Sequence, residues 1–401
     1  MTTEELSKFA EVASQCGPTE AAKKLGVLAS EDVVAVLRRI NPLVAQQILA
    51  HFDEAKTRSI TDSAPEEVRN QWILNSKFPD QTIGRLMDPP VGLFRPQMTV
   101  RETVEELRIL TKRSFITYGY AVDPEGRLLG VIVMRELLLA QPDQTLEEIM
   151  LGGAFSLRPE MTLQEAMRTV LNKHFPVYPV TDADGRLIGL VRGGDLFEAQ
   201  AIDISAQAGS MVGVEKEERL ATSWPRSLRM RHPWLQINLV TVFLAAFVVG
   251  SFQGILEKVV LLAAFIPVLA GQSGNTGCQA LAVMLRGMTL GEWKPGTTKK
   301  LVIKEGMLGV ANGTLVGITA GAGMWVVATM QHLPQALLMG CIVAVAMVVS
   351  CVVSGISGVI TPLVLKKMGA DPATASSIFL TTITDVISNA SFLGLATLLL
   401  N

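Results

Sequence analysis

Five long apolar stretches in the C-terminal part of the chain constrain its fold more than any other feature. Each is long enough to cross a bilayer as a helix. In hydrocarbon the backbone must satisfy its own polar groups, so stretches of this length are expected to be helical. They cover approximately residues 234–252, 259–285, 306–330, 336–365 and 373–400. We therefore predict an all-α membrane domain of five spans over residues 231–401.

The net charge of the chain changes sign just before these stretches. Residues 1–225 hold 24 Lys and Arg against 32 Asp and Glu, a net of −8, and residues 226–401 hold 11 against 5, a net of +6. This asymmetry predicts an acidic soluble part followed by the membrane domain. The start of the chain, MTTEELSKFAEVASQ, has no cationic tip before an apolar core and so does not read as a signal peptide.

The basic residues between the spans predict the orientation of the chain. Ten Lys and Arg fall on one side of the predicted spans, and Lys258 alone falls on the other. Cytoplasmic loops carry the excess of positive charge in membrane proteins. We therefore expect a multi-pass protein of the inner or cell membrane, with the N-terminus and the soluble part in the cytoplasm and the C-terminus outside.

Asp385 is the one acidic residue expected in the middle of a span. A carboxylate at that depth costs at least about 2.5–3.5 kcal/mol to insert, so it normally faces a cavity or an ion path. Counting in fours, Ser377, Thr381, Asp385 and Asn389 would lie along one side of its helix, and Ser388 follows the aspartate by three residues. The other candidate pore residues of this span are Thr381, Thr384 and Ser388. A pair with a base on another helix, or a protonated and hydrogen-bonded carboxyl group, remain as alternatives.

Two copies of the chain would give Asp385 a second carboxylate. Five spans do not form a simple duplicated transporter, and a pore closes more easily if two chains share it. Mg²⁺ keeps several waters and is often held by one or two carboxylates. We therefore expect a homodimer that passes a largely hydrated divalent cation between the two Asp385 side chains.

Glycines mark the second and third spans. In the second, Gly271, Gly274 and Gly277 recur every three residues within PVLAGQSGNTGCQ. Such a string weakens a helix and can expose carbonyl oxygens to a cation, although a close packing face is the open alternative. Gly274, Asn275 and Gly277 are therefore candidate pore residues. In the third span, glycines at four-residue spacing predict a packing face, and Asn312 beside them is the candidate pore residue.

The soluble part contains an internal repeat. RPQMT at residues 95–99 recurs as RPEMT at 158–162, and DPEGRLLGV at 123–131 recurs as DADGRLIGL at 182–190. Each unit predicts a helix, a strand, a hairpin turn, a second strand and a closing helix. This pattern resembles the CBS domain, which normally occurs as a tandem pair, here over 84–202 (about 84–145 and 146–202).

The resemblance to CBS domains raises adenine nucleotides such as ATP as possible ligands. Asp195 fits the position that binds ribose in that family. The hydroxyl residue that the family pattern places three positions earlier is missing, because Arg192 stands there.

The remaining soluble segments contain no catalytic motif. Residues 1–83 predict a domain of short helices. Residues 203–230 predict a linking helix, which is expected to run from Ile204 to Trp224 before Pro225 breaks it. The chain shows no P-loop, no nucleophile elbow and no metal-hydrolase pattern. We therefore expect neither an enzyme nor a nucleic-acid-binding protein.

Taken together, these features resemble the MgtE family of magnesium channels. The resemblance rests on RHPWLQIN at residues 231–238, on residues 267–279 and on DPATAS…TTITD ending at Asp385. It implies a homodimer with one central pore, in which Asp385 binds the cation. It also implies that cytosolic Mg²⁺ bridges acids of the soluble part and of the linking "plug" helix and thereby closes the pore. The candidate sensor acids are Glu215, Glu217, Glu218, Asp203 and Asp195.

The sequence therefore leaves two functions open. The first is a Mg²⁺ channel with Mg²⁺ as both cargo and regulator. The second is a nucleotide-gated secondary transporter that couples protonation of Asp385 to substrate movement. The sequence ranks Mg²⁺ neither above nor below Co²⁺, Ni²⁺ or Mn²⁺.

Overall fold

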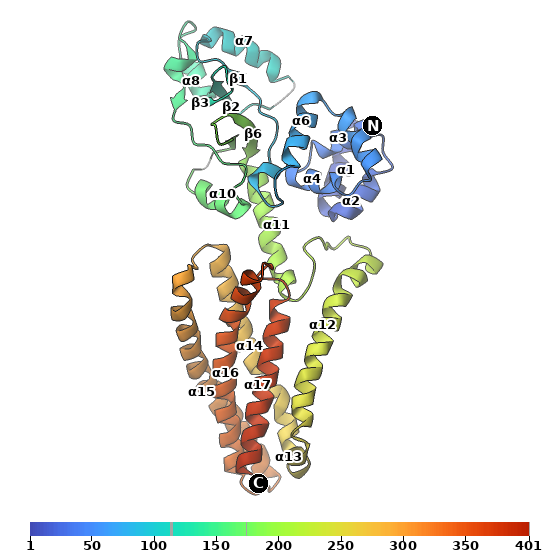
Figure 1. Ribbon diagram of the computed structural model, residues 1–401, viewed down its shortest axis with the longest axis vertical. Helices are drawn as coiled ribbons and strands as arrows, with labels where there is room; N and C mark the ends of the chain where they lie inside the picture. The colour runs from blue at the N-terminus through green and yellow to red at the C-terminus, as the bar shows by residue number, and fades with distance from the viewer. Residues whose placement is uncertain (113–114, 174, 401) are drawn as a thin grey trace. The chain divides into compact units, whose positions relative to one another are not determined.

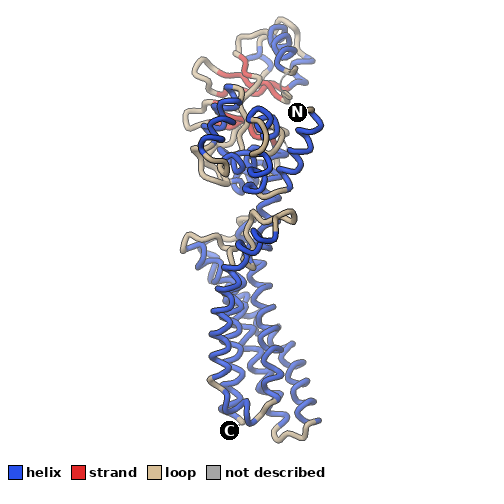
Figure 2. Tube along the Cα trace, turned by 90° about the vertical axis from the view of Figure 1, so that its right-hand side faces the viewer, coloured by secondary structure: helices blue, strands red, loops and turns tan. Residues whose placement is uncertain are grey.

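The computed structural model describes residues 1–112, 115–173 and 175–400, which form two compact units (Figure 1). Unit 1 comprises Met1–Ile204 with Arg219–Thr222, and unit 2 comprises Ser205–Glu218 with the chain from Ser223 onwards. The boundary falls inside helix α11 (Gly193–Met211). Strands occur in unit 1, whereas unit 2 is built of helices and loops (Figure 2).

Unit 1 begins with a domain of short helices whose starts are fixed by local capping. Thr2 and Glu5 form a capping box, Asn41 Oδ1 accepts from the backbone of Leu43, and Asp53 Oδ1 accepts from Lys56. The helices bury one apolar core that includes Leu25, which is 1% exposed. They are α1 (Thr3–Gln15), α2 (Pro18–Leu25), α3 (Ser30–Leu37), α4 (Pro42–Leu49), α5 (Glu54–Ser63) and α6 (Glu66–Asn75).

The rest of unit 1 is the predicted pair of α/β repeats. The first repeat forms a sheet in the order β1-β2-β3-β4, and the second forms the antiparallel hairpin β5-β6. The elements of the first repeat are β1 (Leu93–Phe94), α7 (Val100–Leu110), β2 (Tyr118–Val122), β3 (Leu128–Val133), α8 (Met134–Leu139), α9 (Leu146–Ile149) and β4 (Leu151–Gly152). Those of the second are α10 (Leu163–Val170), β5 (Val177–Thr181), β6 (Leu187–Arg192) and the start of α11.

The two repeats meet at their hairpin turns. Gly126 and Gly185 occupy equivalent turn positions, each with φ of +82°, which favours glycine. The backbone of Leu128 donates to Gly185 O at 3.0 Å, and that of Leu187 donates to Gly126 O at 2.9 Å. The repeat predicted from the sequence is therefore a paired, nearly symmetric structure.

Unit 2 contains five long helices, four of which are long and apolar enough to cross a membrane. Those four are α12 (Trp224–Gly250), α15 (Thr298–Met330, extended by a short turn from Pro295), α16 (Ala336–Lys367) and α17 (Ser376–Leu399). The fifth expected span is α14 (Leu261–Thr289), a 29-residue helix that follows the short α13 (Gln253–Lys258). The polar residues around Asn275 lower the mean hydropathy of α14. It nevertheless packs in the bundle core, where Leu262 and Leu269 are fully buried.

The glycines of α15 form a packing face, as their spacing predicts. A Cβ at Gly309 would lie 2.6 Å from Val352 Cα, and one at Gly313 would lie 2.8 Å from Val348 Cα, both on α16. Helix α16 makes an equally close approach to α14, because a Cβ at Gly358 would lie 2.6 Å from Gly277 O. Small residues thus bring α14, α15 and α16 into close backbone contact.

Three local expectations differ from the structure. The glycine string does not interrupt α14, which is a continuous helix, and Gly277 of the string packs closely against α16. Helix α17 begins at Ser376 rather than at Asp371, whose Oδ1 accepts from Ala373 N in a preceding turn, while Ala375 has φ of +50°. The linking helix ends at Met211, because Gly213 turns the chain with φ of +81°.

We expect Gly358→Ala to destabilise unit 2 by about 1–3 kcal/mol, the usual cost of forcing extra volume into a packed core. Thermal unfolding of the detergent-solubilised protein measures this cost. Gly323→Ala is the matched control, because a Cβ at Gly323 meets nothing within 4 Å. Equal melting temperatures for the two variants would contradict the close approach of α14 and α16.

Candidate pore and gate

Asp385 lies near the middle of α17, and its carboxylate has no partner. The side chain is half-buried, and among the described residues it makes no hydrogen bond or ion pair. Thr384, one residue before it, and Ser388, three residues after it, are 1% and 0% exposed. Asp385 therefore lies at the edge of the packed face of α17. Among the residues that the structure describes in one chain, Asp385 forms neither the interhelical pair with a base nor a hydrogen bond as a carboxyl group.

Helix α14 runs antiparallel to α17 and places its glycine string beside this carboxylate. At one end, Leu281 packs with Leu380, and at the other end Leu269 packs with Phe392. A Cβ at Gly277 would lie 3.1 Å from Leu380 Cδ1. Asp385 is five residues further along, about 7.5 Å at the rise of an α-helix, which matches the turn of α14 just before Gly274.

The candidate residues of α14 differ in their surroundings. Gly274 has open space where a Cβ would stand, and Asn275 is exposed in the single chain. Gly277 is buried against the Ser354 carbonyl of α16, so it serves close packing. Gly274 and Asn275 are therefore not covered by other parts of the same chain, and they lie at about the level of Asp385 along the helices.

Asn312 does not belong to this group of residues around Asp385 on α14 and α17. It is exposed on α15, whose buried glycine face packs against α16. Thr381 lies one turn before Asp385 on α17, with its hydroxyl donating to Ile378 O at 3.1 Å.

Buried polar atoms lie on both α16 and α17, and those on α16 were not anticipated from the sequence. Ser350 Oγ and Ser354 Oγ on α16, and Ser388 Oγ and Asn389 Oδ1 on α17, have no hydrogen-bond partner. The four residues are at most 5% exposed. The i, i+4 spacing of Ser350 and Ser354 is the signal that could have identified the polar residues of α16.

The end of α11 is fastened to the start of α17. Ser210 O accepts from Ala375 N at 2.8 Å, and Met211 O accepts from Ser377 Oγ at 2.6 Å. Lys216 forms an ion pair with Asp371 at 3.0 Å. The end of α11 and the start of α17 are therefore held together within unit 2.

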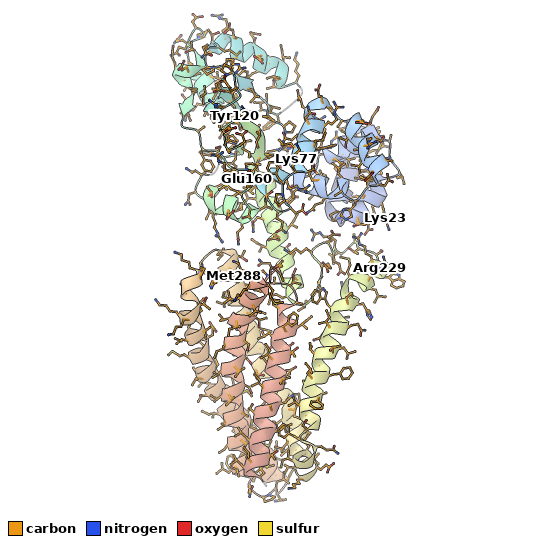
Figure 3. All side chains as sticks on the ribbon, viewed as in Figure 1. Lys23, Lys77, Tyr120, Glu160, Arg229 and Met288 are labelled. Atoms are coloured by element: carbon orange, nitrogen blue, oxygen red, sulfur yellow. The ribbon has the colours of Figure 1, made fainter. Side chains whose placement is uncertain are left out.

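The glutamates predicted for a plug helix lie in the loop between α11 and α12 instead, and two of them are paired with arginines. Glu217 Oε2 lies 3.1 Å from Arg226, and Glu218 accepts from Arg231 Nη2 at 2.5 Å and from its Nε at 2.8 Å. The Glu218 side chain is only 4% exposed. Glu215 is exposed. Arg229 lies in the first turns of the same helix, α12 (Figure 3).

The candidate sensor acids are divided between the two units. Asp195 and Asp203 belong to unit 1, where Gln81 Nε2 donates to Asp203 at 3.5 Å, and the three glutamates belong to unit 2. Over residues 1–112, 115–173 and 175–400, no three acids, histidines or cysteines gather in a group able to hold a metal ion. Their sensor role stays a prediction.

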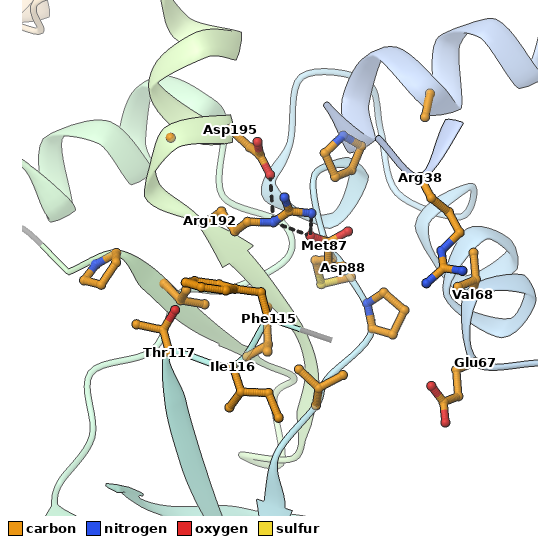
Figure 4. Close-up of a pocket in the computed structure, with 18 of the residues that line it drawn as sticks. Arg38, Glu67, Val68, Met87, Asp88, Phe115, Ile116, Thr117, Arg192 and Asp195 are labelled. Atoms are coloured by element: carbon orange, nitrogen blue, oxygen red, sulfur yellow. Dashed lines mark hydrogen bonds and ion pairs between the residues drawn. The ribbon is translucent and has the colours of Figure 1, made fainter. Parts of the chain in front are cut away.

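Asp195 lines a cavity of unit 1 rather than an open acidic surface. It lies in the first turn of α11, with Oδ2 3.3 Å from Arg192 Nε (Figure 4). Arg192 also bonds Asp88 at 2.5 and 2.9 Å. The position expected to bind ribose is therefore present, with a guanidinium where the family pattern has a hydroxyl group.

The Glu218–Arg231 pair predicts a specific pH dependence of stability. The hydrogen bond from Arg231 lowers the pKa of Glu218. A lowered pKa means stability that is present above the ordinary glutamate pKa of about 4.3 and is lost as pH falls through the folded-state pKa.

We expect Glu218→Gln to lower the melting temperature at pH 7 and to flatten its fall below pH 4.5, the region near the ordinary glutamate pKa of about 4.3. Glu215→Gln, in the same loop, is the control and should leave the profile unchanged. If the melting temperatures of both variants follow the wild-type dependence on pH, the Glu218–Arg231 pair does not stabilise the loop.

Comparison with known proteins agrees with this architecture. The profile of the MgtE family, described as divalent cation transporters, matches residues 266–395, and the CBS profile matches residues 146–202. The chain is 28% identical over 323 residues to the magnesium transporter MgtE of Enterococcus faecalis, covering 80% of this chain and 70% of that protein. It is also 28% identical over 359 residues to MgtE of Thermus thermophilus, covering 89% and 78%.

Among solved structures, the cytosolic domain of the Mg²⁺ channel MgtE in complex with ATP matches with 29% identity and a TM-score of 0.43. The match covers 47% of this chain and 78% of that one.

The MgtE match spans the helices that carry Asp385, Gly274 and Asn275, and the full-length relatives extend it over the soluble part. These relatives are transporters rather than enzymes. The resemblance to the MgtE family of divalent cation transporters that the sequence predicts is therefore confirmed.

Proposed function

We propose that this chain is one subunit of a homodimeric Mg²⁺ channel whose pore passes between two Asp385 side chains. The observation that carries this proposal is the half-buried, unpartnered carboxylate in the middle of α17. A lone charge at membrane depth is stabilised by water, by a cation or by a partner, and the described part of one chain supplies no partner.

A second subunit supplies what one chain lacks. Mg²⁺ prefers oxygen ligands in an octahedral arrangement and keeps several waters. Two Asp385 carboxylates on a twofold axis, with the Asn275 side chains at the same level of α14, would offer oxygen atoms to a hydrated ion. Closed twofold symmetry is also the commonest arrangement of homo-oligomers.

The charge of the connections supports an orientation with unit 1 in the cytoplasm. Arg226, Arg229 and Arg231 lie in the first turns of α12, and further lysines and arginines lie at the ends of α14, α15 and α16 that face the same side, with Lys294 in the loop between α14 and α15. In the connections on the opposite side, the one basic residue of the sequence is Lys258. The positive-inside rule therefore favours a cytoplasmic N-terminus and an outer C-terminus.

The contact between α11 and α17 supports gating from the cytoplasmic side. Backbone and side-chain hydrogen bonds join residues 210–211 to residues 375–377. Residues 1–225 carry a net charge of −8, so their carboxylates repel one another until a divalent cation binds between them. We propose that cytosolic Mg²⁺ binding to these acids moves or holds the segment and so closes the pore.

A proton-coupled transporter is the competing function, because a half-buried carboxyl group could carry a proton instead. Measurements of Mg²⁺ uptake distinguish the channel from the proton-coupled transporter. Uptake that persists without a proton gradient and is blocked by internal Mg²⁺ supports the channel, whereas uptake that requires the gradient supports the transporter.

We expect Asp385→Asn to abolish Mg²⁺ uptake, because it removes the charge and keeps the shape of the side chain. Complementation of cells that lack their other Mg²⁺ importers, at low external Mg²⁺, measures this effect. Glu257→Gln, which changes another acid of unit 2, should grow normally. Normal growth of Asp385→Asn with equal expression would defeat the pore assignment.

We expect Ser377→Ala to weaken closure without reducing maximal uptake, because it removes the bond to Met211 O and no pore ligand. The concentration of internal Mg²⁺ that halves the flux should rise several-fold. Thr397→Ala, which removes a hydroxyl bonded within α17 to Leu393 O, is the control. An unchanged inhibition curve for Ser377→Ala would show that this contact does not transmit the gate.

A further inference from the structure

Six lysines gather at the end of the unit 2 bundle where α15 begins and α16 ends (Figure 1). All six are exposed. The two helices approach closely there, because a Cβ at Gly355 of α16 would lie 2.8 Å from Glu305 O of α15. The lysines therefore form one surface, which we call the lysine patch. It comprises Lys294, Lys299, Lys300, Lys304, Lys366 and Lys367.

The described part of the chain compensates little of this positive charge. Lys304 pairs with Glu305 at 3.4 Å, whereas Lys299 and Lys300 form no ion pair among the described residues. Glu292, the one acid of the loop before α15, is exposed. The helix adds to the charge, because its N-terminus is equivalent to about +0.5 elementary charge and no acid lies in its first turn. An anion bound at this end therefore relieves repulsion that the chain leaves uncompensated.

Apolar side chains continue the patch along the same sides of α15. Ile303 follows Lys300 by three residues and Met307 follows Ile303 by four, so the three lie on one side of the helix. Lys304 is followed in the same way by Leu308. These three apolar residues are exposed, at the start of a span long enough to cross the bilayer. A surface that is apolar within the hydrocarbon and cationic at its edge matches the acyl chains and phosphate of an anionic phospholipid.

Trp293 joins the two helices within the patch. Its indole Nε1 donates to Thr298 Oγ1 at 3.3 Å, and the Lys366 ammonium lies 4.9 Å from the centroid of its ring. This cation–π contact holds the end of α16 against the loop before α15. Tryptophan is enriched where a membrane protein meets the lipid head groups. The patch therefore contains, at its centre, a residue type that marks the head-group level.

We propose that the lysine patch binds an anionic phospholipid of the surrounding leaflet, which the proposed orientation makes the inner one. The lipid phosphate lies among Lys299, Lys300 and Lys366, and the acyl chains run along Ile303 and Met307. Clusters of four to eight basic residues at the end of a span bind anionic head groups in this way. The bound lipid compensates the positive end of α15 and ties α15 to α16.

The competing account of the same lysines is that they only orient the chain, because basic residues on the cytoplasmic side satisfy the positive-inside rule without a ligand. That account requires charge alone. A lipid site also requires exposed apolar residues on the same sides of the helix and a position facing the bilayer. Both are met here, since α15 packs against α16, which in turn packs against α17 (Figure 1). The patch therefore lies apart from Asp385 and from the proposed dimer axis.

Native mass spectrometry of the full-length protein, released from detergent with added lipids of equal acyl chains, tests the proposal. We expect the wild type to bind phosphatidylglycerol at least about tenfold more tightly than phosphatidylcholine, whose choline group cancels the phosphate charge. The double variant Lys299→Gln/Lys300→Gln should lose most of this preference. Inorganic phosphate should not displace the bound phosphatidylglycerol, because it lacks the acyl chains that contact Ile303 and Met307.

The matched control is Lys23→Gln/Lys77→Gln, which removes two exposed lysines from unit 1 (Figure 3) and should keep the wild-type preference. Equal binding of the two lipids by the wild type would overturn the proposal and leave a basic end that only orients the chain. Displacement by inorganic phosphate would overturn it in favour of a site for a free anion. Equal losses in both double variants would assign the preference to net charge instead of the patch. The first two outcomes are read on the wild type, so they depend neither on the folding of the variants nor on Mg²⁺ transport.

Discussion

A carboxylate in the middle of an apolar helix, without a cation beside it, is the constraint on which the membrane unit depends. Asp385 meets this description, because the described part of the chain offers it neither an ion pair nor a hydrogen bond. The bundle around it is assembled by glycines, which let α14 and α15 approach α16 to backbone contact. That rigid packing leaves the Asp385 side of α17 at the edge of the packed core, where a second subunit and a hydrated cation can meet it.

The proposed gating rests on the link between α11 and α17 within unit 2. Residues 210 and 211 hold the first turn of α17 through their carbonyl oxygens, and Lys216 holds Asp371. The following loop is held by arginines of α12, which neutralise Glu217 and Glu218. A divalent cation at Glu217 or Glu218 would have to compete with these arginines.

Most of the architecture could be predicted from the sequence, because it follows from local patterns. The 63- and 59-residue offsets locate the repeats, and capping residues such as Asn41 locate helix starts. What could not be predicted depends on contacts between distant segments. The glycines of α14 suggested an irregular backbone, but α14 is a continuous helix in which Gly277 packs against the neighbouring α16. The ion pairs of Glu217 and Glu218, and the shared guanidinium of Arg192, join residues whose proximity no spacing indicates.

The central claim is that two Asp385 carboxylates face each other across a twofold axis around a hydrated divalent ion. A density map of the full-length protein in Mg²⁺ tests it most directly. The account predicts a dimer with an ordered peak on the axis, within water-bridged distance of both Asp385 side chains. A map in which Asp385 faces lipid, or bonds to a neighbouring helix away from any water-lined path, would contradict it.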